Sequence, residues 1–324
     1  MRSPDLKISV IIPLKKLNEY VRETLEYLAR QTYRNFDVYV ITDNAERIDV
    51  TGLDVKFLSS GPVPPNYKRM QAAQMSDAEI IALIDDDAYP VPDWLEAAVR
   101  HFADSHVVAV GGPGITPPSD SAWQQVSGAV YASPLVSAAY VYRYLPQEMR
   151  DVDDYPSCNL VARRAAFLSA VPQCLKYWPG EDTKLCMLIT RGSQRIVYDP
   201  QVAVYHHRRR LFWGHFRQIW NYAVHRGFFA KRYPATSLRA QYFVPTAFVA
   251  GNLATALLPR APRPLRNVAG GLALVYAALV TIEALRSGRE HRANPAAVAL
   301  GIYMTHLTYG VGFAFGITRS ELDH

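Results

Sequence analysis

Three kinds of motif are missing from this chain of 324 residues, and each absence argues against a class of protein. The first apolar run, residues 8–14, is too short for a secretory signal peptide and continues into a fold pattern. No Gly-x-Gly-x-x-Gly follows it, which argues against a dinucleotide-dependent dehydrogenase. No sequence motif of the known nucleic-acid-binding modules is present, so we expect no nucleic-acid partner.

Cysteine is scarce as well. The three cysteines, Cys158, Cys174 and Cys186, have neither the close spacing of a metal-binding motif nor an even number for full pairing. We therefore expect free thiols and a reducing compartment.

The clearest positive feature is an apolar run that ends in three carboxylates. Residues 78–84 are followed by Asp85, Asp86 and Asp87. The run predicts a buried strand of a mostly parallel sheet, and the carboxyl ends of such strands hold ligands. In extended geometry Asp85 and Asp87 point the same way and Asp86 points away, so the pair suits Mg²⁺ or Mn²⁺. The alternative is an acidic strand-to-turn junction in solvent.

Strands and helices are predicted to alternate over the first two thirds of the chain. The expected strands are 8–13, 36–42, 55–58, 78–84, 107–110, 157–163, 195–198 and 202–205. The expected helices are 18–31, 68–75, 93–102, 164–170 and 183–191. This order predicts a Rossmann-like α/β fold with a mostly parallel sheet flanked by helices. The aromatic-rich stretch 119–154 has no clear pattern and is interpreted as a mobile or membrane-facing insert.

The composition changes after residue 232. Three apolar stretches, 241–258, 268–285 and 295–316, approach the length of membrane-spanning helices, with arginines in the loops between them. They predict a membrane-associated helical region, either spanning or lying in the interface, and a buried helical subdomain is the alternative. The net charge of +6 also favours anionic lipid or phosphate partners. We therefore expect two domains, 1–232 and 233–324.

The order of two acidic motifs resembles that of inverting family 2 glycosyltransferases of GT-A fold. These motifs are Asp85-Asp86-Asp87 and Gly180-Glu181-Asp182, preceded by Val10-Ile11-Ile12-Pro13 and Asn18-Glu19. The resemblance covers about residues 8–233 and is strongest to membrane-associated bacterial members that build cell-surface polysaccharides. Two departures stand out. Thr42-Asp43 replaces the usual Asp-Asp pair, and the Gln-x-x-Arg-Trp signature of processive synthases is absent.

The resemblance implies a role for each of a set of residues. Asp182 would be the catalytic base, with helix capping as the alternative, and Asp85, Asp87 and His206 would bind Mn²⁺ or Mg²⁺. His206 has a structural role as its alternative. Donor or acceptor contacts are implied for Pro13, Glu19, Asp43, Lys68, Arg69, Asp86, Trp178, Glu181, Arg208 and Arg209. Trp178 is equally compatible with simple packing, and the Arg208–Arg210 cluster with contact to anionic headgroups.

The implied activity is transfer of a sugar from a nucleotide-sugar, UDP-linked by expectation, to a lipid-linked or membrane-bound glycan. The catalytic domain would face the cytoplasm at the inner membrane of the cell. Three other functions stay open: a polyprenyl-phosphate sugar synthase, a metal-dependent nucleotidyltransferase and a non-catalytic membrane scaffold. The oligomeric state is not predicted.

Overall fold

The computed structural model describes residues 5–255 and 262–322, which divide into two compact units. The sheet unit contains the residues up to Pro117 and Tyr142–His207. The helical unit contains Pro118–Val141 and the residues from Arg208 onward. This division differs from the predicted boundary after residue 232, because the helix at 213–232 packs with the C-terminal helices.

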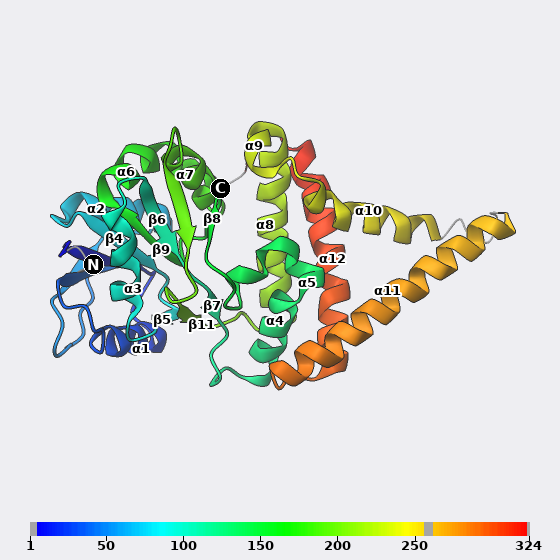
Figure 1. Ribbon diagram of the computed structural model, residues 1–324, viewed down its shortest axis with the longest axis horizontal. Coiled ribbons are helices and arrows are strands. Elements are labelled where there is room, and N and C mark those ends of the chain that lie inside the picture. Colours follow the sequence, from blue (N-terminus) through cyan, green and yellow to red (C-terminus); the bar gives the residue numbers. More distant parts are fainter. Residues whose placement is uncertain (1–4, 256–261, 323–324) are drawn as a thin grey trace. The chain divides into compact units, whose positions relative to one another are not determined.

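An eight-stranded sheet forms the centre of the sheet unit (Figure 1). Its strand order is β3-β2-β1-β4-β9-β6-β10-β8, and only β9 and β8 run antiparallel to their neighbours. The strands are β1 (Ile8–Pro13), β2 (Phe36–Thr42), β3 (Val55–Ser59), β4 (Ile80–Ile84), β6 (Val107–Gly111), β8 (Arg150–Val152), β9 (Asn159–Arg163) and β10 (Arg195–Tyr198). The predicted α/β fold with a mostly parallel sheet is thus confirmed.

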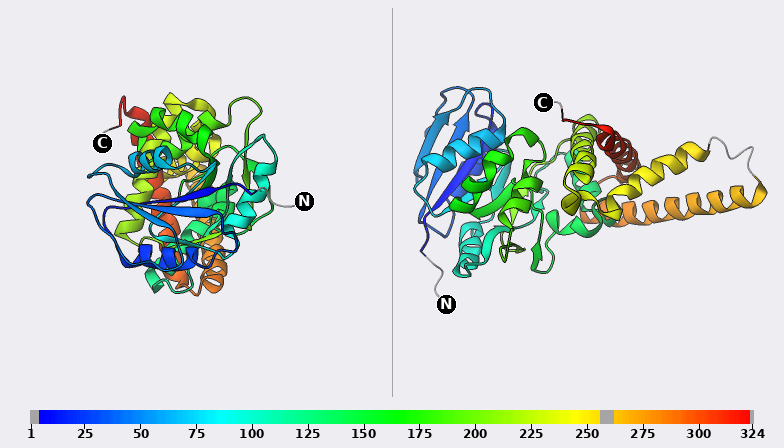
Figure 2. Two further views of the ribbon diagram at one scale, coloured as in Figure 1. Left: turned by 90° about the vertical axis from the view of Figure 1, so that its left-hand side faces the viewer. Right: turned by 90° about the horizontal axis from the view of Figure 1, so that it is seen from above.

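Helices cover both faces of this sheet (Figures 1 and 2). Val10 and Ile12 of β1 point to one face and join the core formed with α1 (Glu19–Leu28) and α3 (Trp94–Arg100). On the opposite face lie α2 (Pro65–Met75), α6 (Arg164–Ala170) and α7 (Glu181–Ile189). Because both faces are covered, the strands read as continuous apolar runs rather than as alternating ones.

A second, three-stranded sheet has the order β5-β11-β7. Its strands are β5 (Ala88–Pro90), β11 (Val204–His206) and β7 (Gly114–Ile115). β5 was not predicted, because three residues after a turn carry no periodicity. The sheet matters for function because β5 directly follows the three aspartates and β11 carries His206. Short 3₁₀ helices lie at His101–Ala103, Ala138–Arg143, Val171–Gln173 and Leu175–Tyr177.

The helical unit is built from seven helices in the part of the chain that the structure describes. They are α4 (Ala122–Ala132), α5 (Pro134–Ser137), α8 (Trp213–Arg232), α9 (Pro234–Ser237), α10 (Ala240–Thr255), α11 (Arg263–Glu290) and α12 (Pro295–Thr318). Helices α4 and α5 occupy most of the first half of the stretch that had no clear sequence pattern. Val126 and Val130 of α4 are buried beside Val280 and Val298, so this segment is part of a core.

Glycines let α8 and α12 approach closely. A Cβ atom at Gly227 would lie 2.1 Å from the carbonyl oxygen of Phe313, and one at Gly316 would lie 2.1 Å from that of Val224. Gly312 faces Ala223 in the same contact. Small residues four apart on both helices therefore form an interface in which backbone meets backbone, as is common between helices in lipid.

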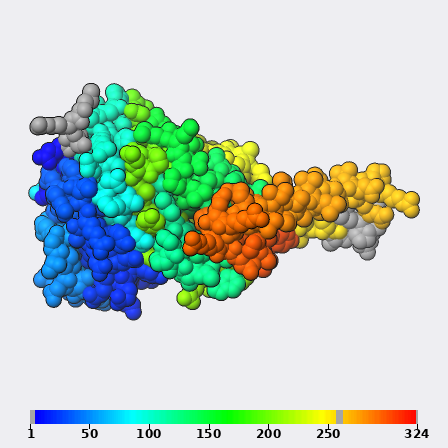
Figure 3. All heavy atoms as spheres, turned by 60° about the horizontal axis from the view of Figure 1, so that its bottom comes forward, coloured from blue at the N-terminus to red at the C-terminus, as the bar shows by residue number. Residues whose placement is uncertain are grey.

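Helices α11 and α12 are long and apolar enough to cross a membrane, by length and composition. The predicted stretch 241–258 corresponds to α10, which has 16 described residues and contains Pro245. Residues 256–258 of that stretch, and Arg260, lie outside the described residues. α11 exposes Leu272 and Leu274 to 67% and 74%, and its outer part stands clear of the other helices of its unit (Figures 1 and 3).

Candidate active site

Three potential metal ligands from distant parts of the sequence meet in the sheet unit. Asp85, Asp87 and His206 each offer one ligand atom, and these atoms lie within 4.8 Å of one another. Asp87 is buried and the other two are partly buried. Two carboxylate oxygens and one imidazole nitrogen form a donor set that fits a divalent cation such as Mn²⁺.

The backbone explains how these three side chains converge. β4 ends at Ile84, and a turn closed by the N–H of Ala88 on the carbonyl of Asp85 (3.2 Å) leads into β5. β11 pairs antiparallel with β5 and places His206 opposite Ala88. The N–H of His207 also donates to the carbonyl of Asp87 at 2.9 Å. The shared direction of Asp85 and Asp87 thus arises in a turn and not in an extended strand.

His206 is held beside a carboxylate. Its Nε2 lies 3.1 Å from Oδ1 of Asp87. Burial disfavours the charged imidazole, but Asp87 outweighs burial and, with a smaller contribution from Cys158, raises the pKa of His206 to about 10. Without a cation, His206 is therefore protonated and neutralises part of the aspartate cluster. A bound cation would replace that proton.

Asp86 turns away from the other two aspartates. Its Oδ2 accepts a hydrogen bond from Nδ2 of Asn18 at 2.6 Å. The same Asn18 caps α1, because its side-chain oxygen accepts from the N–H of Val21 at 2.9 Å. Asp86 therefore links the start of α1 to the end of β4.

Arg69 of α2 connects the metal-ligand group to the start of α7. Its Nη2 lies 2.5 Å from Oδ1 of Asp85, and its Nη1 lies 3.1 Å from Oε1 of Glu181. The Arg69 side chain is only 5% exposed. The guanidinium therefore bridges two acidic motifs that the sequence places almost 100 residues apart.

Glu181 and Asp182 begin α7, as predicted. Burial, assisted by the charge of Asp182 and opposed by Arg69, raises the pKa of Glu181 to about 7. Asp182 is more open than Glu181, and its Oδ1 accepts from the N–H of Thr183 at 2.8 Å. This local contact is compatible with capping and with a base role.

The residues expected to touch the donor near β1 and α1 lie in different protein surroundings. Lys68 donates to the carbonyl oxygen of Leu14 at 2.6 Å and forms an ion pair with Asp43. Pro13 is buried at the end of β1, whereas Glu19 is exposed at the start of α1. The donor contacts of these residues remain predictions.

The remaining predicted residues lie in different surroundings. Trp178 is 42% exposed in the sheet unit. Arg208 belongs to the helical unit, where its backbone N–H donates to Asp120 at 3.1 Å and its guanidinium lies over the ring of Tyr131. Arg209 follows it in the same unit. Roles for these three residues also remain predictions.

Two residues near the metal-ligand group were missed at the sequence level. Cys158, which precedes β9, interacts with His206 through a side-chain hydrogen bond. Asn18 contacts Asp86, as described above. A helix-capping signal could have singled out Asn18, but no sequence signal marks Cys158, because strand pairing alone brings it near His206.

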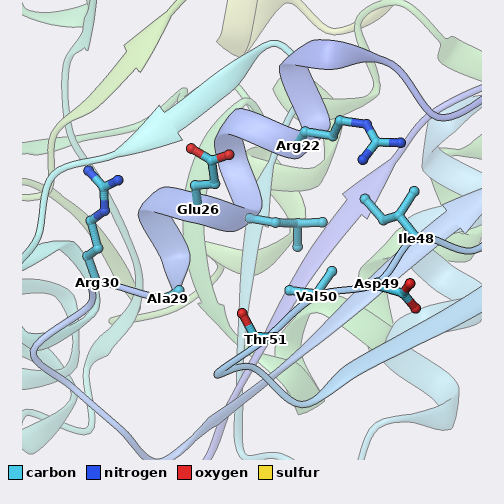
Figure 4. A pocket seen from close by; sticks show the side chains of 9 residues that line it. Arg22, Glu26, Ala29, Arg30, Ile48, Asp49, Val50 and Thr51 are labelled. Atoms are coloured by element: carbon cyan, nitrogen blue, oxygen red, sulfur yellow. The ribbon is translucent and has the colours of Figure 1, made fainter.

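A separate shallow pocket of about 350 Å³ lies between α1 and residues 48–51 (Figure 4). Its charged lining side chains are Arg22, Glu26, Arg30 and Asp49. None of the predicted site residues lines it, and its two positive and two negative charges give it no preference for a charged ligand.

The fold and the acidic group together define a class of protein, and comparisons with known proteins agree. Residues 9–169 match the family described as Glycosyl transferase family 2, which supports a glycosyltransferase of this family. The mannosyltransferase PcManGT from Pyrobaculum calidifontis, solved with GDP-Man and Mn²⁺, has the same fold. Its TM-score is 0.59 at 17% identity, over 96% of this chain and 87% of that one.

Curated relatives are also glycosyltransferases. A glucosyl-dolichyl phosphate glucuronosyltransferase of Haloferax volcanii is 24% identical over 66% of this chain and 75% of its own length. A hyaluronan synthase of Streptococcus pyogenes is 26% identical over 33% of this chain and 29% of its own length. GalNAc-T7, solved with UDP, GalNAc and Mn²⁺, matches with a TM-score of 0.50 at 15% identity, over 72% of this chain and 51% of that one. These findings support a family 2 glycosyltransferase.

Proposed function

We propose that this protein is a metal-dependent, inverting glycosyltransferase that moves a hexose from a nucleotide-sugar to a lipid-linked or membrane-bound glycan. The observation that carries the proposal is the convergence of Asp85, Asp87 and His206 in a domain of this family. We place the enzyme at the cell inner membrane with the sheet unit in the cytoplasm. Its product would enter cell-surface polysaccharide or glycoconjugate assembly.

The acidic group would hold the cation that a leaving diphosphate requires. A divalent cation bound there would neutralise the charge that develops on the nucleoside diphosphate. Asp85 and Asp87 would supply oxygen ligands, and His206 would supply a nitrogen once its proton is lost. Mn²⁺ suits this nitrogen-containing set better than Mg²⁺, and two solved neighbours contain Mn²⁺.

Asp182 is our candidate for the base. Inversion requires a base that accepts the proton of the attacking hydroxyl on the face of the sugar opposite the leaving group. Asp182 is partly exposed at the N-terminus of α7, where the helix dipole favours an ionised carboxylate. Glu181 is buried and bound to Arg69, so it is less suited to meet an acceptor.

The acceptor and donor follow from separate considerations. The apolar exposed surface of α11 supports a membrane-bound acceptor, and one relative acts on a glucosyl-dolichyl phosphate, a lipid-linked sugar. This favours a lipid-linked glycan over a polyprenyl phosphate itself. The neighbours were solved with GDP-Man or with UDP, and we propose a UDP-linked donor.

The test is Asp182→Asn in the full-length protein, measured as acceptor-dependent release of UDP. Asparagine keeps the size and the hydrogen bond but cannot accept a proton, so transfer should fall by about 10²–10⁴-fold. Donor affinity, measured by calorimetry with Mn²⁺, should stay within a few-fold of the wild type. Asp77→Asn, at an exposed carboxylate, is the matched control and should leave both unchanged.

Four outcomes would count against the proposal. Transfer within a few-fold of wild type in Asp182→Asn would remove Asp182 from the mechanism and leave Glu181 as the next candidate. Turnover that persists in EDTA would exclude the metal role. Release of pyrophosphate instead of UDP would indicate a nucleotidyltransferase, and the absence of any Mn²⁺-dependent UDP binding would indicate a non-catalytic scaffold.

A further inference from the structure

Arg69 occupies an unusual position between two acidic motifs. Its two terminal nitrogens contact different carboxylates, Asp85 after β4 and Glu181 at the start of α7. Both Arg69 and Glu181 are buried, while the Asp85 side chain is 33% exposed. One rigid, planar group therefore spans the distance between the metal-ligand group and the proposed base region.

Stability alone does not explain this arrangement. Burying a guanidinium and two carboxylates costs desolvation energy that ion pairing only partly recovers. In addition, the Nε atom of Arg69 is buried without a hydrogen-bond partner among the described residues, which adds to the cost. A buried apolar side chain would avoid both costs. The two-ended contact is what arginine offers that lysine and apolar residues do not.

The contact also limits what Arg69 can do for a donor. The sequence resemblance implies a direct contact between Arg69 and the nucleotide-sugar. In the structure both terminal nitrogens already bind carboxylates, and the side chain is almost fully covered. Its neighbour Lys68 is likewise occupied, by Asp43 and the carbonyl of Leu14.

We propose that Arg69 is a positioning residue that ties the Asp85 carboxylate, which the proposed function makes a cation ligand, to Glu181 at the start of α7. Donation to Oδ1 of Asp85 fixes the orientation of this carboxylate, so that its other oxygen is aimed at the cation. Because Glu181 holds the other end of the same guanidinium, a change at Glu181 alters cation binding at Asp85. Such coupling is reciprocal between the two positions.

The direct measurement is Mn²⁺ affinity of the full-length, nucleotide-free protein in detergent, followed by the electron paramagnetic resonance of free Mn²⁺. Arg69→Lys keeps the positive charge but replaces two separate terminal nitrogens in a fixed plane by a single one. The two contacts are then not held in their present geometry, so Mn²⁺ binding should weaken at least threefold. Arg164→Lys is the matched control. Among the contacts described, the Arg164 side chain donates only to the carbonyl of Ala73, so this variant should leave Mn²⁺ affinity unchanged.

A second pair of variants distinguishes a positioning role of Arg69 from a general effect of charge on Mn²⁺ binding. The same pair tests the proposal if Arg69→Lys does not fold. Glu181→Gln and Asp182→Asn remove the same charge from adjacent residues. Of these two residues, only Glu181 contacts Arg69 among the contacts described. Positioning predicts that Glu181→Gln weakens Mn²⁺ binding at least threefold and that Asp182→Asn changes it less than twofold. Where both variants fold, adding Glu181→Gln to Arg69→Lys should produce little further loss.

The outcomes distinguish this proposal from the proposed function on which it rests. Loss of Mn²⁺ binding in Asp87→Asn would establish the cation site. If Asp87→Asn binds Mn²⁺ as well as the wild type, both proposals fall. If that site is established, unchanged or tighter Mn²⁺ binding in Arg69→Lys overturns the positioning role alone. A raised donor KM with unchanged Mn²⁺ affinity would show instead that Arg69 contacts the donor. Equal effects of Glu181→Gln and Asp182→Asn on Mn²⁺ affinity would show that only the charge near the site matters, and would overturn the positioning role of Arg69.

Discussion

The sheet unit and the helical unit differ in how far their apolar side chains are exposed. In the sheet unit, the apolar residues of β1 and β4 are completely buried between two layers of helices. In the helical unit, α11 leaves Leu272, Leu274 and Ile282 largely exposed. Exposed apolar surface of this kind is consistent with a membrane location for part of the helical unit.

The two units also differ in how their elements are held together. In the sheet unit large side chains fill the space between sheet and helices, which is the arrangement expected where water drives apolar groups inward. Between α8 and α12, glycines bring two backbones into contact. Lipid provides no such driving force, so close packing must supply the attraction. Both observations are consistent with a membrane location for the C-terminal helices.

The largest effect should come from a charge in the middle of α11. Leu274→Arg places a cation at an exposed position near the centre of this helix, which in lipid costs about 3–4 kcal/mol relative to leucine. We expect at least about 100-fold weaker association with phospholipid vesicles, measured by flotation. Met75→Arg is the control, since Met75 is 57% exposed in the sheet unit and should not change association.

If Leu274→Arg floats with vesicles as well as wild type, or if the wild-type protein stays monodisperse without detergent, α11 does not enter lipid. The greater exposure of apolar side chains in the helical unit would then not reflect contact with lipid.

A smaller effect is expected at the contact between α8 and α12. A Cβ at Gly316 would lie 2.1 Å from a backbone carbonyl, so Gly316→Val must push the helices apart, at a cost of about 1–3 kcal/mol or more. We expect a lower melting temperature in detergent and faster hydrogen exchange in α8. Gly271→Val on α11 is matched, because the same residue change occurs in a helix with open space around it. Equal destabilisation by both variants would show that helix propensity, and not the close contact, is responsible.

The smallest effect is a pH dependence confined to the helical unit. His215 is buried, with Nδ1 2.8 Å from the hydroxyl of Ser127 and Nε2 3.0 Å from that of Thr305. Burial, assisted by the charge of Arg208, lowers the pKa of His215 to about 3. Its pKa in the unfolded chain is about 6.5, so the unfolded state binds a proton first as the pH falls.

The stability that neutral His215 contributes is therefore complete above pH 6.5 and is lost between pH 6.5 and pH 3. At pH 5 the loss should be about 2 kcal/mol, from about 1.4 kcal/mol per pH unit. The measurement is hydrogen exchange of α8 peptides at pH-corrected rates. His215→Gln should lower stability at pH 8 but remove this part of the pH dependence. A wild-type unit whose α8 stability is the same at pH 5 and pH 8 would contradict the prediction.

Much of the architecture was predictable because its causes are local. Apolar runs at 8–13, 36–42 and 78–84 predict buried strands, since covered parallel sheets need them. The two acidic motifs, Asp85-Asp86-Asp87 and Gly180-Glu181-Asp182, could be identified in the sequence. The apolar stretches beyond residue 232 predicted helices. Two of those stretches form helices long enough to span a membrane, whereas the stretch 241–258 is described only as far as Thr255 of α10.

What the sequence could not determine were the partners of side chains that lie far apart in the chain. The register of β11 on β5 places His206 opposite Ala88, and the packing of α2 against the end of β4 and the start of α7 places Arg69 between Asp85 and Glu181. Similarly, the sequence predicts that Lys68 and Asp43 each contact the nucleotide-sugar donor, and the structure shows that they form an ion pair with each other. Local periodicity fixes which face of an element is apolar, but it carries no information on which distant charge lies opposite. That depends on strand register and helix packing, which only the complete tertiary structure sets.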